Sequence, residues 1–185
     1  MTIPENKLKP DWQLGLLKSM RNPKAIVATD AWVTVIKDAY PKAEKHYLIL
    51  PKAYIRDLKA LNSTHLPILR HMEKVAKYII DIEDKSRTFM LGYHAEPSIK
   101  QLHMHIISND LNSKFLKTKR HWNSFTTDFF LKPEDVAYSI ETKGYVSILT
   151  PEQCEQYLKA PLVCHKCTYY PKDMPDLKRH ILIHK

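Results

Sequence analysis

The sequence is poor in glycine. Its 185 residues include only Gly15, Gly92 and Gly144. The loops that enclose phosphates in P-loop and dinucleotide-binding proteins need several closely spaced glycines. These three glycines are too far apart to form such a loop, so both classes of nucleotide-binding protein are excluded.

Cysteine and long apolar runs are also scarce. Only Cys154, Cys164 and Cys167 are present, and an odd, small number argues against a disulfide-bonded scaffold. The chain has no run of about 18 apolar residues, so we expect no membrane-spanning helix. Its first residues lack the apolar stretch of a secretory signal. We therefore expect a soluble, intracellular protein that does not bind a membrane.

Negative charge is in the minority. Lys and Arg total 29 against 20 Asp and Glu, which gives a formal net charge of +9. Such a chain favours a polyanionic partner such as nucleic acid, because each phosphate contact releases counterions. A surface that only keeps the protein soluble would give the same count. Apolar residues make up 44% of the chain, enough for a real core.

The apolar pattern predicts a mixed fold. Strands are expected over 25–29, 32–36, 46–50, 88–94, 102–108 and 145–149. Helices are expected over 11–20, 53–60, 65–84, 133–143 and 151–159. Strands and helices do not alternate regularly, so we expect an α+β fold with an antiparallel sheet.

The clearest chemical signal is the segment Gln-Leu-His-Met-His-Ile-Ile-Ser over 101–108. Side chains alternate along a strand, so His103 and His105 share one face with Gln101, and the apolar residues between them face the core. Two imidazoles are costly as core filling because each needs a hydrogen-bond partner. They indicate a catalytic or metal site. Metal is the weaker choice, since no third carboxylate or cysteine is evident nearby.

This strand resembles the histidine-triad motif His-φ-His-φ-His-φ-φ, with Gln101 in place of the first histidine. Further segments are similar, in the same order, to the aprataxin family of that superfamily: 35–43 with His46, 91–95 with 97–98, and 121–125. The similarity runs from about Trp12 to the C-terminus. It implies a histidine-triad fold, an antiparallel sheet with flanking helices, over 1–149 and a zinc-finger domain over 150–185.

The resemblance implies a DNA-repair hydrolase that cleaves a phosphoanhydride bond. It would remove AMP from 5′-adenylated DNA ends and leave a 5′-phosphate. His103 would attack the α-phosphate, and water would then release AMP from the adenylated histidine. A neutral imidazole, with an ordinary pKa of ~6.5, suits this step without a catalytic metal. His94 would act as acid and then base, and His105 would complete the catalytic set.

The same resemblance implies a set of AMP- and phosphate-binding residues: Asp38, His46, Ser98, Gln101, Lys42 and Ile36. Asp38 would accept hydrogen bonds from the ribose, and apolar residues around Ile36 would enclose the adenine. Gln101 would donate to phosphate oxygens. An amide can still form hydrogen bonds, so we expect activity to survive this departure from the triad.

A second motif lies near the C-terminus. Cys164-x2-Cys167-x12-His180-x3-His184 has the spacing of a two-cysteine, two-histidine zinc site. A helix over 175–184 would place both histidines on one face. We therefore expect a structural zinc ion. His165, between the cysteines, is expected to be exposed.

Basic side chains provide the predicted DNA contacts. Phosphate contacts are expected from Lys172, Lys178 and Arg179 of the finger, and from Lys114, Lys117, Lys119 and Arg120. The second run is equally compatible with a solvated loop. Trp12 would stack on the terminal base pair or anchor the core.

The resulting hypothesis is a nuclear, monomeric enzyme acting on nicked or double-stranded DNA with a 5′-adenylate. RNA–DNA junctions are a further candidate substrate, and AMP is the product. A small-molecule nucleotide hydrolase of the same superfamily stays open, although the finger and the charge disfavour it. A non-catalytic DNA-end-binding module also stays open, with Gln101 as a sign of a decayed triad, although retention of His94 and His103 argues against it.

Overall fold

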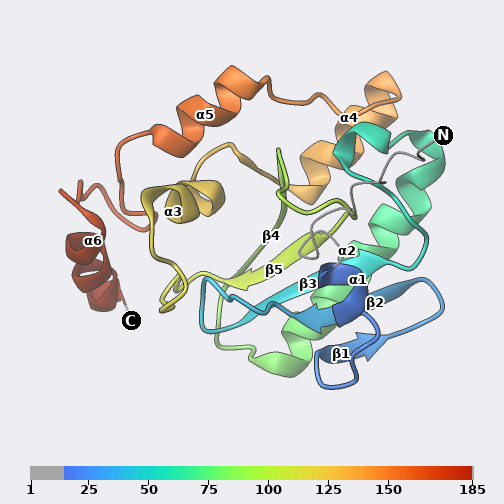
Figure 1. The fold of residues 1–185 in the computed structure, drawn as a ribbon, viewed down its shortest axis with the longest axis horizontal. Coiled ribbons are helices and arrows are strands. Elements are labelled where there is room, and N and C mark those ends of the chain that lie inside the picture. Colours follow the sequence, from blue (N-terminus) through green and yellow to red (C-terminus); the bar gives the residue numbers. More distant parts are fainter. Residues whose placement is uncertain (1–14, 185) are drawn as a thin grey trace, which may run out of the picture.

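The computed structural model describes residues 15–184. Six strands form an antiparallel sheet in the order β1-β2-β3-β5-β4-β6 (Figure 1). These strands are β1 (Ile26–Thr29), β2 (Val33–Lys37), β3 (His46–Pro51), β4 (Phe89–His94), β5 (Met104–Ser108) and β6 (Phe130–Leu131). The α+β fold with an antiparallel sheet is confirmed.

The helices lie on both faces of this sheet and at its edge. They are α1 (Gly15–Ser19), α2 (Leu66–Glu83), α3 (Lys119–Thr126), α4 (Pro133–Lys143), α5 (Pro151–Lys159) and α6 (Met174–His180). Single 3-10 turns cover Leu58–Ala60, Ser63–His65 and Ile181–His184. None of the helices in the described part of the chain has the length and apolar character needed to cross a bilayer.

Two predicted elements are wrong. The helix expected over 53–60 is reduced to the 3-10 turn Leu58–Ala60, and the strand expected over 145–149 is reduced to a single bridge between Tyr145 and Asn62. The helix α3 and the strand β6 were not expected. The other predicted helices and strands are present within a few residues, as far as the structure describes them.

One face of the sheet is covered by α2. Leu69, Met72, Ala76 and Ile79 of this helix are buried in one cluster with apolar residues of β2, β3 and β5. Leu102, Met104 and Ile106 belong to that cluster, as their alternation predicted. Consequently the residues between them on β5 face the opposite side.

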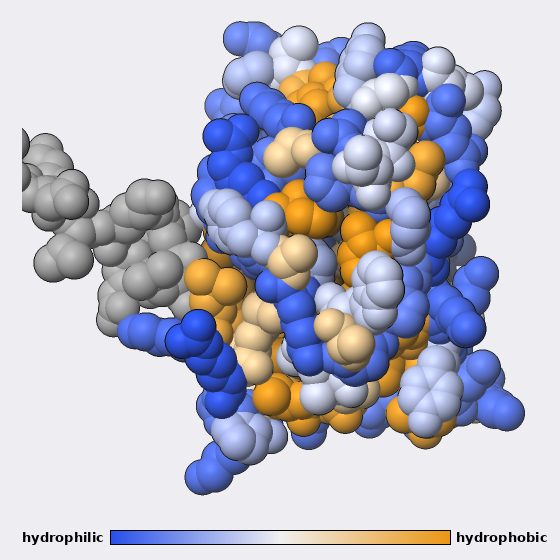
Figure 2. Space-filling view, turned by 90° about the vertical axis from the view of Figure 1, so that its right-hand side faces the viewer, coloured by the Kyte–Doolittle hydropathy of each residue, from blue (hydrophilic) through white to orange (hydrophobic). Residues whose placement is uncertain are grey.

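The opposite face carries two separate apolar clusters. Leu16 of α1 packs with Ile36, Leu48 and Leu50. Ile107 lies in the other cluster, with residues of α3 and of the C-terminal segment. The register pairs Leu48 with His105 and His46 with Ile107, so the histidines lie where the two clusters meet. The outer surface seen in Figure 2 is mostly hydrophilic, with apolar groups lying between hydrophilic side chains.

Candidate active site and zinc site

Three adjacent strands bring four imidazoles together. β5 lies between β3 and β4, His46 begins β3 and His94 ends β4. From the ring centroid of His105, the centroids of His94, His103 and His46 lie 4.4, 5.1 and 5.2 Å away. His94 had been expected at the end of a neighbouring antiparallel strand, and the structure places it there.

Hydrogen bonds determine which nitrogen carries the proton in two of these rings. The backbone N–H of Lys42 donates to Nδ1 of His46 at 3.1 Å, so a neutral His46 carries its proton on Nε2. That Nε2–H donates to Nδ1 of His105 at 2.9 Å, which leaves the proton of His105 on Nε2. This last donor is buried and has no partner among the described residues. It is available to an incoming acceptor such as a phosphate oxygen.

His103 has the opposite tautomer. Its Nδ1 lies 2.8 Å from the backbone carbonyl oxygen of Gln101. A carbonyl oxygen only accepts, so Nδ1 carries the proton and Nε2 keeps a free lone pair. The ring is partly exposed, whereas His46 and His105 are buried. An accessible neutral imidazole with a free Nε2 is suited to nucleophilic attack.

Burial keeps all four imidazoles neutral. Desolvation is the main cause of a lowered pKa for each ring, and it brings the pKa of His46 to about 4 and that of His94 to about 3. A positive charge on Lys42 adds to this for His46, His94 and His105. At neutral pH, His94 therefore holds no extra proton to give to a leaving group.

Asp38 lies beside the buried pair. Its Oδ2 is 3.7 Å from Nε2 of His46, and its Oδ1 accepts the backbone N–H of Tyr40 at 2.7 Å. Ligand atoms of Asp38, His46 and His105 lie within 4.8 Å of one another. The structure thus supplies a third potential ligand, the carboxylate of Asp38, beside the two histidines. An ion there would replace the hydrogen bond between the two rings.

The other predicted binding residues are spread around the rings. Lys42 is partly buried, which lowers the pKa of its ammonium group, and that group bonds to the carbonyl oxygen of Tyr40. Ser98 is exposed on the loop between β4 and β5, and no contact among the described residues joins its hydroxyl to the imidazoles. Ile36 is only 1% exposed, so its packing leaves little surface for an adenine.

Gln101 differs from its expected role. Its Nε2 donates to the carbonyl oxygens of Pro51 at 3.0 Å and Ala53 at 3.5 Å. The amide protons expected to bind phosphate are therefore used by the backbone.

Phe125 and His121 were not among the predicted site residues. The Phe125 ring centroid lies 4.7, 5.3 and 5.6 Å from those of His94, His105 and His46, so this side chain shields three imidazoles from water. Burial and the nearby positive charges of Lys42 and Lys117 lower the pKa of His121. The only signal for these two residues was their place in segment 121–125.

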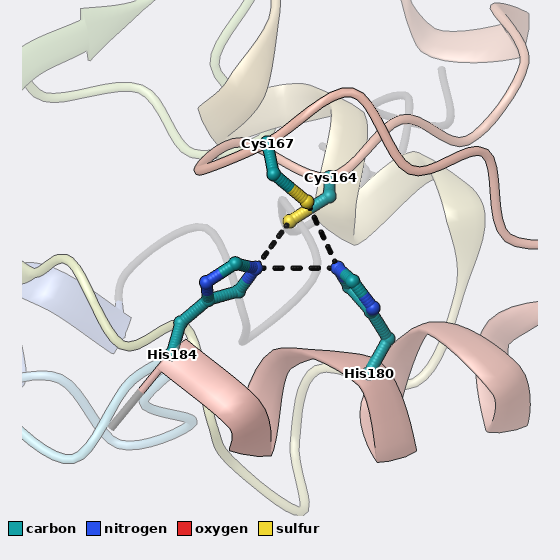
Figure 3. Close-up of side chains that lie close together, drawn as sticks. All are labelled: Cys164, Cys167, His180 and His184. Atoms are coloured by element: carbon teal, nitrogen blue, oxygen red, sulfur yellow. Dashed lines mark hydrogen bonds between the residues drawn. The ribbon is translucent and has the colours of Figure 1, made fainter.

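The finger residues converge as a metal site would require. Cys164 Sγ is 3.4 Å from His184 Nε2, Cys167 Sγ is 3.1 Å from His180 Nε2, and the two Nε2 atoms are 3.2 Å apart (Figure 3). Ligands at about 2.0–2.3 Å from a tetrahedral zinc ion are separated by roughly 3.3–3.8 Å. All four ligand atoms lie within 4.8 Å of one another, so the residues fit zinc.

The expected exposure of His165 is wrong. Its Nε2 donates to the carbonyl oxygen of Asn109 at 2.8 Å, and its ring packs edge-on against Trp122 at 5.1 Å. Asn109 directly follows β5. The segment between the two cysteines therefore contacts the end of the strand that carries His105.

Some of the predicted DNA-binding side chains already have partners. Lys178 Nζ donates to the carbonyl oxygen of Ser113 at 2.8 Å, and Arg179 and Arg120 form ion pairs with Asp176 and Glu155. The exposed lysines of the set are Lys114, Lys117, Lys119 and Lys172. Trp12 lies outside the described residues.

Comparison with known proteins identifies two families along the chain. The family described as "Scavenger mRNA decapping enzyme C-term binding" matches residues 11–121, and "C2HE / C2H2 / C2HC zinc-binding finger" matches residues 126–185. Aprataxin of Gallus gallus is 45% identical over 175 residues, covering 94% of this chain and 55% of that protein. Aprataxin of Danio rerio is also 45% identical, covering 94% and 53%. The chain spans about half the length of these curated relatives.

Solved structures show the same fold. The crystal structure of aprataxin ortholog Hnt3 in complex with DNA has a TM-score of 0.77 at 21% identity, covering 94% of each chain. That of aprataxin ortholog Hnt3 from Schizosaccharomyces pombe has a TM-score of 0.74 at 20% identity, covering 97% of this chain and 93% of that one. The antiparallel sheet with its flanking helices and the imidazoles on adjacent strands has the histidine-triad fold. The chain belongs to the family of the first match, and the relatives that are 45% identical to it are aprataxins.

Proposed function

We propose that this chain is a DNA-repair hydrolase that releases AMP from 5′-adenylated DNA ends through an adenylated His103. The observation that carries the proposal is the hydrogen bond from His103 Nδ1 to the Gln101 carbonyl oxygen. It leaves a free Nε2 lone pair on a neutral, partly exposed ring. The unpaired Nε2–H of His105 lies on the neighbouring ring.

The reaction has two steps. Nε2 of His103 attacks the α-phosphorus, the bond from phosphorus to the bridging oxygen breaks, and its electron pair leaves with the 5′-phosphate of the DNA. Water then attacks the same phosphorus and gives a proton to His94, the bond from phosphorus to Nε2 breaks, and AMP leaves with His103 in its neutral form. The Nε2–H of His105 stabilises charge on a non-bridging oxygen in both steps.

His94 serves the leaving group in this scheme. Its Nε2 is buried without a partner among the described residues, and it lines a narrow cavity together with His103. With a pKa of about 3, the free ring is unprotonated. The negative charge of the bound pyrophosphate raises that pKa, so His94 acquires its proton as the substrate binds.

DNA as the substrate is supported by the relatives and by charge. The curated relatives are aprataxins, and one structural neighbour is an aprataxin ortholog in complex with DNA. The net charge of +9 and the exposed lysines suit a polyanion. We assign zinc a structural role in the finger. Nuclear location, a monomeric state and RNA–DNA junctions as substrates stay predictions.

Adduct trapping tests the proposal. We expect rapid quenching in alkaline detergent, in which a phosphorus–nitrogen bond to histidine survives, to leave label on the protein after mixing with adenylated, nicked duplex labelled in the AMP. His103→Ala should leave none, while His71→Ala, on the far helix α2, should behave like wild type. Full single-turnover AMP release by His103→Ala would contradict the assignment. Faster turnover of a small adenylated amine than of DNA would favour the small-molecule alternative.

A further inference from the structure

Gln101 has an unusual backbone conformation. Its φ is 152°, in a region that residues other than glycine rarely adopt. The same peptide segment provides the carbonyl oxygen that accepts the Nδ1–H of His103. A strained conformation persists only where surrounding contacts hold it, so the contacts of Gln101 bear directly on His103.

Those contacts reach the last residue of β3 and the chain segment that follows it. The backbone N–H of Gln101 donates to the carbonyl oxygen of Arg56 at 3.1 Å, and that of Leu102 donates to Ile55 at 2.7 Å. The side-chain Nε2 reaches the carbonyl oxygens of Pro51 and Ala53. The backbone bonds attach the segment through its N–H groups, and the side chain adds a second attachment at Gln101 itself.

The orientation of this amide follows from its neighbours. Two carbonyl oxygens face the Nε2 atom, and an oxygen in that place would be repelled by both. The other end of the amide, Oε1, is buried without a partner among the described residues. The side chain leaves one acceptor unsatisfied while its donor holds the backbone.

We infer that Gln101 is a positioning residue: its side-chain amide holds the strained peptide whose carbonyl oxygen keeps the proton of His103 on Nδ1. This inference rests on the proposed function for its catalytic meaning. In place of a donor to phosphate, the residue at the first triad position here determines which nitrogen of the nucleophile is free.

Nitrogen-15 NMR of the imidazoles tests this without substrate, because it reports which nitrogen carries the proton. In wild type we expect His103 protonated on Nδ1 alone. In Gln101→Ala we expect both tautomers, together with a single-turnover rate lowered about tenfold, the effect of one lost hydrogen bond.

Asn123→Ala is the matched control. Asn123 is also buried, and its Nδ2 donates to two carbonyl oxygens, those of Leu158 and Ala160, at 3.2 and 2.8 Å. This variant should lose stability as Gln101→Ala does, without a change in the tautomer of His103. An unchanged tautomer in Gln101→Ala, or an equal change in both variants, would overturn the inference.

Two further substitutions give independent readouts. Gln101→Glu places a carboxylate against the two carbonyl oxygens, so its rate should be low at pH 8 and should recover as the pH falls and the buried acid gains a donor proton. Gln101→His should restore the Nδ1-protonated His103. A pH profile equal to that of wild type in Gln101→Glu would also overturn the inference.

If wild type forms no AMP adduct, the proposed function fails, but the tautomer still tests the role of Gln101.

Discussion

The imidazoles are neutral because burial removes the water that would stabilise a proton on them. His46 is 4% exposed and His105 is 5% exposed, and Phe125 covers both rings. Asp38 favours the charged form of His46, but desolvation outweighs it. A buried base that stays unprotonated needs no catalytic step to remove a proton first.

This burial makes stability depend on pH. The unfolded chain binds protons at these rings near pH 6.5, whereas folded His46 and His94 bind them only near pH 4 and 3. As the pH falls below about 6.5, only the unfolded state gains protons, so the free energy of unfolding decreases. For His46 alone the full loss, reached near pH 4, is about 3 kcal/mol.

Urea unfolding at pH 7.5, 6 and 5 measures this effect. We expect the midpoint to fall along the series, and His46→Gln to show a shallower decline because one titrating ring is gone. A midpoint that stays constant from pH 7.5 to 5 would show that the rings already bind protons in the folded protein.

At the scale of elements, the short strand β6 can pair with β4 only because Gly92 of β4 has no side chain. A Cβ on Gly92 would lie 2.7 Å from a ring carbon of Phe130 and 2.8 Å from the carbonyl oxygen of Leu131. The backbone of Leu131 cannot move without breaking the pairing of β6 with β4. The ring centroid of Phe130 lies 5.8 Å from that of His94. The close contact between Gly92 and Phe130 therefore also affects the site.

Gly92→Ala should therefore destabilise the protein by about 2 kcal/mol, the range for an overpacked core, and should lower the rate of AMP release. Gly15→Ala is the control, because nothing lies within 4 Å of its added Cβ. Thermal unfolding of both variants, with activity measured on the folded fraction, makes the comparison. Equal melting temperatures would contradict the close packing at Gly92.

Periodicity predicted most elements, because α2 and the longer strands bury one regular face. Periodicity failed where backbone N–H and carbonyl groups form hydrogen bonds with side chains or with distant segments, and not within a helix or a strand pair. Over 145–149, Ser139 Oγ donates to the Tyr145 carbonyl oxygen and accepts the N–H of Ser147, which removes groups that a strand ladder would use. Over 53–60, carbonyl oxygens that a helix would need accept from Gln101 and Leu102.

The candidate site was predictable in its residue types and not in its hydrogen bonds. Alternation placed His103 and His105 on one face, and cysteine and histidine spacing gave the metal ligands. The proton positions depend on a backbone N–H at Lys42 and a backbone carbonyl at Gln101. Every residue type offers the carbonyl and every type except proline the N–H, so side-chain identity does not reveal them. Only the folded chain shows which of these groups meet the rings.

At the scale of the molecule, the finger and the sheet share one core. Leu162, Leu177 and Ile181 pack with Ile107 and Trp122. The indole N–H of Trp122 also donates to the carbonyl oxygen of Val163 at 3.0 Å. The domain boundary predicted after residue 149 stays a prediction, but apolar packing crosses it.

Removing zinc should therefore weaken the whole chain. Without the ion, Leu177 and Ile181 lose their fixed place in the shared core, which costs about 3–5 kcal/mol. We expect a chelator to lower the melting temperature in a single cooperative transition and added zinc to reverse it. Tryptophan fluorescence, to which the buried Trp122 contributes, and far-UV circular dichroism measure the transition. A second, unshifted transition would show that the sheet folds independently of the finger.

The backbone donor at Lys42 has a consequence for natural variation. The proton order in His46 and His105 begins at an amide group, so exchanging the side chain at position 42 leaves that order intact. Proline alone lacks the amide hydrogen. A proline at position 42 would let His46 adopt the other tautomer, and the tautomer of His105 would then change as well. Among orthologous chains, whatever other demands act on the side chain at position 42, proline should be absent there.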